Sequence, residues 1–203
     1  MERDEHMDMK KQETKQETAD GFDLFMRFAD GCRCYLLDKG AISKGDNQAI
    51  LDYFRTGRRP RFDVLRRVYY VAVPGLEAAG RRMKKGKFDA EVVREFYAFD
   101  HNKMKVGQGN YVCIAFPARV MESRGKDYLF ELSPVSGRFW VESDLGLKAG
   151  DWVIVHRMNI VERISPEYAK TVSDSLIKLG MNKEMRFPEK AMEYLKGLKF
   201  YGV

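Results

Sequence analysis

The length, composition and charge of the chain exclude several classes of protein. Its 203 residues allow one ordinary domain or two small ones, and 44% hydrophobic with 33% charged residues is typical of a soluble globular protein. No apolar run approaches the ~18 residues that a membrane span needs, and the first residues show no secretory pattern. We therefore expect a cytoplasmic protein without a membrane partner.

Residues 1–18 are rich in Lys, Glu and Gln without any apolar period, which predicts a disordered tail. Between residues 19 and 106 the spacing of apolar residues is helical and predicts a bundle of about five short helices. Ser43 and Asp89 are expected N-caps. Pro74 is expected to end a helix that begins at Phe62.

The first helix carries Cys32 on its apolar stripe, together with Phe25, Ala29 and Leu36, and we expect Cys32 to be a core residue. Cys34 points to another side of this helix, because neighbours two apart lie about 200° apart. No second cysteine pair follows to complete a zinc site. His101 lies near a helix end, where we expect a favourable charge rather than a catalytic role.

The helical region is strongly basic. Eleven Lys or Arg residues between Arg55 and Lys87 face two acids, Asp63 and Glu77, so this segment has a net charge of +9. Such a field attracts polyanions or an acidic protein. The predicted patch for nucleic acid or an acidic partner consists of Arg58, Arg59, Arg61, Arg66, Arg67, Arg81, Arg82, Lys84 and Lys85. A solvated helical face is the alternative interpretation.

The pattern changes at the polar linker 107–110, beyond which the apolar runs resemble strands. They are Tyr111–Met121, Asp127–Leu132, Arg138–Ser143 and Asp151–Ile164, separated by Gly- and Pro-containing turns. Short strands at this spacing favour a small closed barrel. Ser165 and Pro166 are a strong start signal for a helix that runs to Gly180. Residues 181–203 are expected to form a helical extension, with a last helix that begins at Pro188.

The fold class predicted from these patterns is α+β. A basic α-helical domain (19–106) is followed by a small OB-like β-barrel with a carboxyl-terminal helix (107–180).

Two sequence motifs in the barrel region carry the functional prediction. The first is Cys113-Ile-Ala-Phe-Pro117, and the second is Gly150-Asp-Trp-Val-Ile-Val-His156. Together with the helix after Ser165 they resemble the hydrogenase maturation chaperones of the HypC/HupF family. That resemblance covers about a third of the chain and does not extend to residues 1–106.

The resemblance implies an OB-like barrel that carries iron, with Cys113 as ligand and His156 assisting. It also implies a protein partner, a metalloenzyme precursor or assembly factor, that contacts Cys113, Pro117, His156 and Arg157. A thiolate is a soft ligand suited to such iron, and imidazole either binds the metal or orients the thiolate. From the residues alone, Cys113 is also explained as a small buried side chain, and His156 as a buried, hydrogen-bonded ring.

The leading functional hypothesis is therefore an accessory chaperone of metalloenzyme assembly that is not an enzyme. The first alternative is a nucleic-acid-binding protein in which segment 55–87 grips phosphates and the barrel assists. The second is a protein-interaction adaptor without metal chemistry, because a fold does not determine a function.

Overall fold

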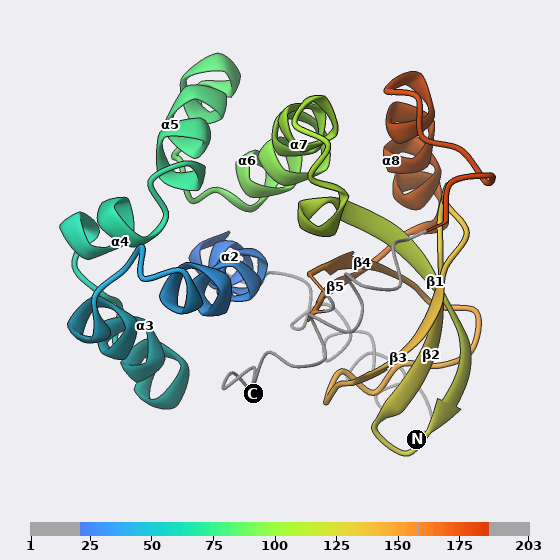
Figure 1. Cartoon of the computed structure of the whole chain (residues 1–203), viewed down its shortest axis with the longest axis horizontal. Helices are drawn as coiled ribbons and strands as arrows, with labels where there is room; N and C mark the ends of the chain where they lie inside the picture. Colours follow the sequence, from blue (N-terminus) through green and yellow to red (C-terminus); the bar gives the residue numbers. More distant parts are fainter. Residues whose placement is uncertain (1–20, 158, 187–203) are drawn as a thin grey trace, which may run out of the picture.

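The computed structural model describes residues 21–157 and 159–186, in which an amino-terminal group of helices precedes a sheet and a final helix (Figure 1). The α+β class is therefore confirmed. The helical elements before the sheet are α2 (Gly21–Asp38), α3 (Lys44–Thr56), α4 (Phe62–Val68), α5 (Ala72–Met83), α6 (Ala90–Glu95), a π-helical segment η1 (Phe96–His101), α7 (Asn102–Gly107) and a 3-10 helix η2 (Tyr111–Cys113). The strands and last helix are β1 (Ala115–Arg124), β2 (Asp127–Leu132), β3 (Arg138–Glu142), β4 (Trp152–His156), β5 (Asn159–Ile164) and α8 (Pro166–Lys178).

Helix starts agree with the capping signals in the sequence. Ser43, Asp89 and Ser165 each accept a hydrogen bond from a backbone N–H in the first turn of α3, α6 and α8. The prediction for Pro74 is wrong, because this residue lies in the first turn of α5 rather than at the end of α4. The first turn of a helix tolerates proline, since its backbone nitrogens have no intrahelical acceptor.

The strands form one antiparallel sheet in the order β3-β2-β1-β4-β5. The predicted closed barrel is wrong for the described residues, because β3 and β5 are the two edges of this sheet and do not pair with each other. Helices occupy the β5 edge instead. Arg27 of α2 donates to the carbonyl oxygen of Val161, and Arg94 of α6 makes a bidentate ion pair with Glu162.

Two of the differences from the predicted strand boundaries bear on the site. The run Asp151–Ile164 is a hairpin of β4 and β5 rather than one strand, and Arg157 follows β4 with a left-handed φ of 49°. The run predicted to begin as a strand at Tyr111 begins as the 3-10 helix η2, so Cys113 precedes β1. The alternating apolar pattern alone does not mark either break.

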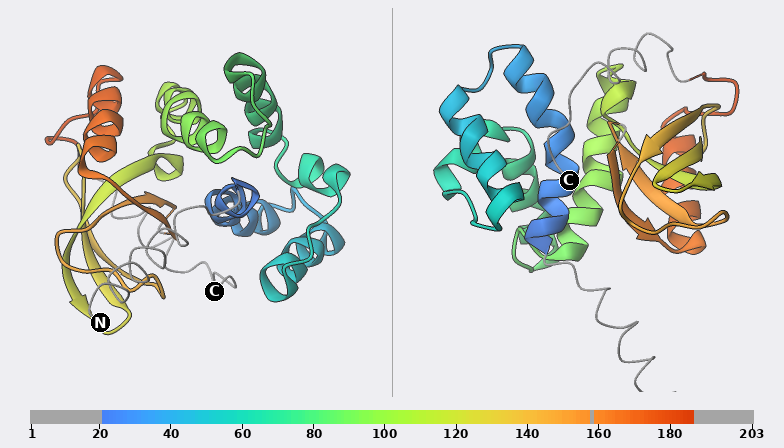
Figure 2. Two further views of the ribbon diagram at one scale, coloured as in Figure 1. Left: turned by 180° about the vertical axis from the view of Figure 1, so that it is seen from behind. Right: turned by 90° about the horizontal axis from the view of Figure 1, so that it is seen from below.

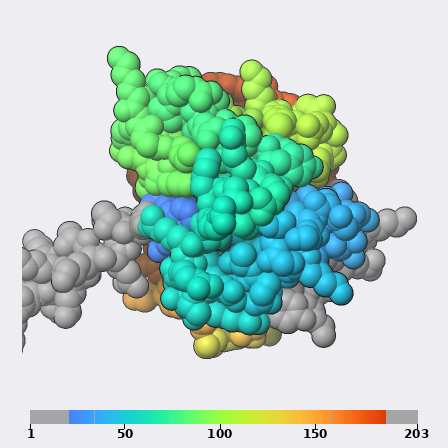
Figure 3. Space-filling model, turned by 90° about the vertical axis from the view of Figure 1, so that its left-hand side faces the viewer, coloured from blue at the N-terminus to red at the C-terminus, as the bar shows by residue number. Residues whose placement is uncertain are grey.

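Helix α2 lies near the middle of the molecule, with α3 and α4 on one side and strands β4 and β5 on the other (Figures 1 and 2). Its buried residues, including Phe25 and Phe28, belong to a hydrophobic cluster that runs without interruption from the helices into the sheet. Helix α8 packs against β1 and β4. Helices α3, α4 and α5 cover the side of α2 away from the sheet and form much of the face in Figure 3.

Some predictions fall outside the described residues, namely the tail 1–18 and the helix that begins at Pro188. Within the described part of the chain, no helix has the length and apolar character that crossing a membrane requires.

Candidate metal centre

Cys113 lies where the helical region joins the sheet, at the end of η2, and is 2% exposed. Buried Asn102 holds this junction in place. Its side-chain oxygen accepts from the N–H of Ala115, and its amide nitrogen donates to the carbonyl oxygens of Ala115 and Ala98. Because β1 pairs with β4 in a register that puts Ala115 opposite His156, this junction also brings Cys113 next to His156.

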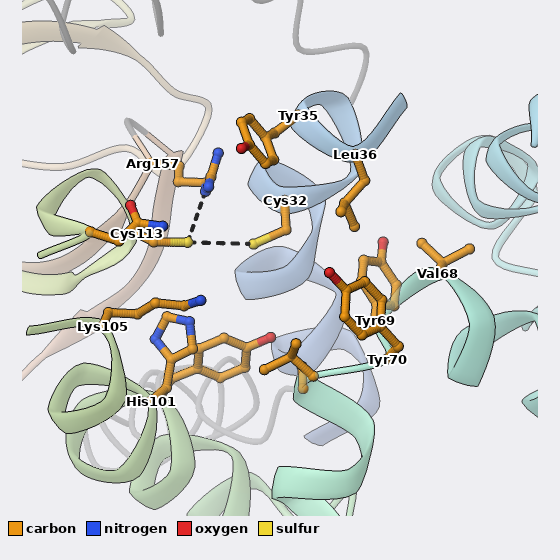
Figure 4. Close-up of a pocket in the computed structure, with 14 residues that line it drawn as sticks. Cys32, Tyr35, Leu36, Val68, Tyr69, Tyr70, His101, Lys105, Cys113 and Arg157 are labelled. Atoms are coloured by element: carbon orange, nitrogen blue, oxygen red, sulfur yellow. Dashed lines mark hydrogen bonds between the residues drawn. The ribbon is translucent and has the colours of Figure 1, made fainter. Parts of the chain in front are cut away.

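The second sulfur of the site belongs to Cys32 of α2, whose Sγ lies 4.0 Å from Sγ of Cys113 (Figure 4). The prediction of a purely core role for Cys32 is therefore corrected, since this thiol faces another thiol and lines a cavity. The apolar stripe correctly indicated that Cys32 faces inward. It did not reveal that the facing segment contributes Cys113. The side chain of Cys34 is outside the described part of the structure.

Arg157 completes the polar contacts of Cys113, because its Nε donates to Cys113 Sγ over 3.0 Å. Its guanidinium also stacks over the ring of Tyr35 at 4.7 Å. Gly31 of α2 permits this arrangement. A Cβ at Gly31 would lie only 2.9 Å from Cβ of Arg157, so the hairpin turn approaches α2 more closely than any other residue type would allow.

His156 is fully buried and both of its ring nitrogens face backbone carbonyl oxygens. Nδ1 lies 2.7 Å from the oxygen of Phe28 in α2, and Nε2 lies 3.1 Å from the oxygen of Cys113. The ring therefore joins α2 to the sheet. One ligand atom each from His156, Cys32 and Cys113 lies within 4.8 Å of the others, which is close enough for one metal ion to touch all three.

A second imidazole, His101, lies at the site without having been predicted there. Its ring centroid is 5.4 Å from that of His156, and its Nδ1 is buried with no hydrogen-bond partner in the described structure. The π-helical segment η1 positions His101 and Tyr97 together, and such segments often occur at functional sites. Burial lowers the pKa of His101 below its ordinary value, which keeps the ring neutral.

The two thiols have opposite electrostatic behaviour. The neighbouring Cys32 thiol, as a hydrogen-bond donor, holds the pKa of Cys113 well below its ordinary value, with help from His101 and His156 and against the effect of burial. The same contact, with burial, raises the pKa of Cys32. Cys113 therefore ionises first, and Cys32 remains a thiol that donates to it. Burial disfavours the Arg157 cation, but the two thiols outweigh this effect and raise its pKa.

A cavity of about 110 Å³ opens beside the two thiols. Its lining includes the buried side chains of Cys113, His101 and Arg157 together with Cys32, and its other walls are largely aromatic and aliphatic. Tyr70 lines the cavity and is 57% exposed, so the cavity reaches the surface beside this residue. A small ion or molecule can therefore reach the sulfurs without the fold coming apart.

The residues predicted to bind a partner protein lie inside the structure. Cys113, Pro117, His156 and Arg157 are all buried, and Pro117 lies within β1 opposite Ile154 of β4. These four side chains therefore offer no surface on which a partner protein could dock directly in this structure.

The predicted basic patch lies on α4, α5 and the turns beside them, and most of its cations have acidic partners. The ion pairs include Arg67 with Asp46 and Asp63, Arg82 with Asp100 and Glu95, Lys85 with Glu91, Arg66 with Glu77, Arg61 with Asp63, and Arg58 with Asp52. Several of these acids come from outside segment 55–87, where a count along the sequence does not include them. The surface is therefore less positive than the segment charge indicates.

Comparisons with known proteins add no further assignment, because neither protein-family models nor curated proteins match this chain. The resemblance to hydrogenase maturation chaperones accordingly depends on the motif residues, of which the structure brings Cys113 and His156 together.

Proposed function

We propose that this protein is a metal-handling accessory factor that binds a thiophilic transition-metal ion, with iron as the expected cargo, through Cys32, Cys113 and His156. One observation carries the proposal: the ligand atoms of these three residues lie within 4.8 Å of one another in a buried site. The group draws on three segments of the chain, α2, η2 and β4, and its two cysteines are 81 residues apart.

The donor set fits such an ion chemically. Two thiolates and an imidazole suit iron or zinc, whereas calcium and magnesium require oxygen ligands. The lowered pKa of Cys113 favours the first thiolate of the ligand set. Binding of the ion to Cys32 then displaces the proton that Cys32 shares with Cys113. The N–H of Arg157 remains directed at the Cys113 sulfur, in the position of an outer contact that tunes a metal ligand.

His156 enters this ligand set by exchanging one contact. Its Nε2 faces the carbonyl oxygen of Cys113, so the ring must give up that hydrogen bond to offer a lone pair to the ion. The Nδ1 contact with Phe28 remains and fixes the ring, as is usual for a metal-bound histidine. Three protein ligands leave one position of a tetrahedral ion open toward the cavity. An open position and a cavity that reaches the surface suit a protein that receives and passes on an ion.

The test is anaerobic titration of the reduced protein with Fe²⁺, and with Co²⁺ as a spectroscopic probe of thiolate ligation. We expect one ion per chain and a thiolate-to-cobalt absorbance band. Cys32→Ser, Cys113→Ser and His156→Ala should each weaken binding at least about tenfold. Cys34→Ser is the matched control, since it changes a cysteine in the same helix without altering the three proposed ligands.

Two results would contradict the proposal in different ways. Unchanged cobalt binding in both Cys32→Ser and Cys113→Ser would remove the thiolate site altogether. Loss of binding in His101→Ala but not in His156→Ala would keep the thiolate site and transfer the imidazole position to His101, whose Nδ1 has no partner in the described structure.

A further inference from the structure

The two thiols are already in near contact without a metal. Packing of α2 against the sheet leaves Sγ of Cys32 4.0 Å from Sγ of Cys113. A disulfide bond is about 2 Å long, so each sulfur needs to move by only about 1 Å toward the other. A change of side-chain rotation supplies a movement of this size without unfolding either segment.

The surroundings of the pair distinguish an attacking sulfur from a resolving one. Arg157 Nε donates to Cys113 Sγ at 3.0 Å, which favours the thiolate at Cys113. Cys32 is the neighbouring thiol, and the hydrogen bond between the two sulfurs orients it toward Cys113. Of the two, Cys113 is therefore the nucleophile.

The cavity provides both a route and a binding position for a small oxidant. Its volume of about 110 Å³ is several times the ~10–15 Å³ that a cavity needs to hold one water molecule, so it has room for hydrogen peroxide. Nη1 of Arg157 is buried with no partner in the described structure, although it belongs to the same guanidinium that contacts Cys113 Sγ. This unused N–H is a donor for an oxygen atom placed next to the sulfur.

We propose that Cys113 and Cys32 form a peroxide-reactive dithiol that closes to an intramolecular disulfide. The thiolate of Cys113 attacks one peroxide oxygen, the O–O bond breaks, and Cys113 becomes a sulfenic acid while hydroxide leaves toward Arg157. The sulfur of Cys32 then attacks the sulfenic sulfur, the S–O bond breaks, and the departing hydroxide takes the Cys32 proton as water. The first hydroxide takes up the proton that Cys113 gave to solvent when it ionised, so the two thiols lose two electrons in total and peroxide is reduced to two molecules of water.

The disulfide and a bound metal exclude each other, because the disulfide uses the sulfur atoms that act as thiolate ligands. This consequence depends on the proposed metal function, whereas formation of the disulfide does not. Oxidation would then release the ion and link α2 covalently to the start of the sheet.

The experiment starts from the full chain with Cys34→Ser, which is freed of metal and fully reduced. This protein is treated with hydrogen peroxide, its remaining thiols are alkylated, and the product is analysed by mass spectrometry. We expect a mass decrease of about 2 Da for loss of two hydrogens, and a linked pair of peptides that contain Cys32 and Cys113. Cys32→Ser should stop at a sulfenic acid that dimedone traps at Cys113. Arg157→Met should slow the reaction about tenfold or more, and the same chain in urea should form the disulfide more slowly, because unfolding separates the two thiols.

The proposal is overturned if both thiols of the folded protein stay open to alkylation after excess peroxide, or if the product is an intermolecular link. It is also overturned if Cys113→Ser still consumes peroxide as fast as the parent chain. Adding Co²⁺ before peroxide separates the two proposals. If peroxide forms the disulfide in the metal-free protein and bound cobalt prevents it, both proposals are supported. If the disulfide forms and cobalt does not bind, the dithiol alone is supported. If cobalt binds but peroxide forms no disulfide even in the metal-free protein, the metal site alone is supported.

Discussion

Replacing Gly31 with alanine tests how the fold positions Arg157 at the thiols. A Cβ at this position would lie 2.9 Å from Cβ of Arg157 and 3.2 Å from Nδ2 of Asn159. Helix α2 and the β4–β5 turn must therefore move apart by several tenths of an ångström. Overpacking of this kind costs about 1–3 kcal/mol, and replacing a helical glycine with alanine returns about 1 kcal/mol. The expected net loss of unfolding free energy is about 1 kcal/mol, with a range of about 0–2.

The same substitution should change the chemistry of Cys113. Movement of the turn lengthens the contact between Arg157 Nε and Cys113 Sγ, which is 3.0 Å in the parent structure. We therefore expect the pKa of Cys113 to rise toward its ordinary value, measured from thiolate absorbance against pH in the Cys34→Ser background. Urea denaturation under reducing conditions measures the stability change.

Gly45→Ala is the matched control for Gly31→Ala. Gly45 lies in the first turn of α3, where the nearest atom to an added Cβ is Ser43 Oγ at an ordinary 3.8 Å. This variant should keep the parent stability or gain up to about 1 kcal/mol, with an unchanged thiolate titration. If Gly31→Ala behaves in the same way as Gly45→Ala in both measurements, close packing against α2 is not what holds Arg157 in place.

Four further predictions follow from contacts described above. Because the pKa of Cys113 is lowered in the folded protein, its thiolate stabilises the fold above the unfolded pKa of about 8.5, and this contribution is lost as pH falls through the folded pKa. The difference in unfolding free energy between the parent and Cys113→Ala should therefore shrink as pH falls. A constant difference from about pH 9 downward would contradict this prediction. Asn102→Ala leaves the N–H and carbonyl of Ala115 without their partner and should cost about 2–4 kcal/mol in urea denaturation, so a loss below about 1 kcal/mol would show that water replaces the amide. Glu162→Gln should lower the unfolding free energy by about 1–3 kcal/mol, because it weakens the partly buried ion pair with Arg94. Asp174→Asn is the control, since it removes an exposed ion pair with Lys170 and should lower the unfolding free energy by less than about 1 kcal/mol. Equal effects of the two substitutions would argue against a stabilising link between α6 and β5. RNA and duplex DNA should bind too weakly to measure by fluorescence anisotropy at physiological salt, because acidic side chains neutralise much of the basic patch. Tight binding at physiological salt that is lost in Arg58→Glu would restore the nucleic-acid hypothesis.

Local signals in the sequence predicted much of the secondary structure. The caps at Ser43, Asp89 and Ser165 were found because a cap depends on residues within one turn of it. Pro74 was misplaced because proline marks a helix boundary without saying on which side the helix lies. Barrel closure was wrong because it depends on what covers the β5 edge, and the contacts of Arg27 and Arg94 there come from distant helices.

The candidate site was only half visible in the sequence. Cys113 and His156 lie in two strand-associated motifs, and antiparallel pairing of those strands brings them together. Cys32 and His101 come from helices outside these motifs, and their position depends on tertiary packing that a single sequence does not reveal. Asn102 lies in the polar run Asp100-His-Asn-Lys103, so nothing in its neighbourhood indicated that its amide is buried and satisfied at the junction.

The division of the thiol site between two distant segments has a consequence for biosynthesis. Cys32 leaves the ribosome early, Cys113 near the middle of synthesis and His156 later still, so no nascent chain can assemble all three until the β4 strand has been made. Loading of the proposed ion through these residues would thus report that the helices have docked on the sheet. A chain truncated within the linker 107–110 would keep Cys32 but lack Cys113 and His156, and so could not bind the proposed ion through this group.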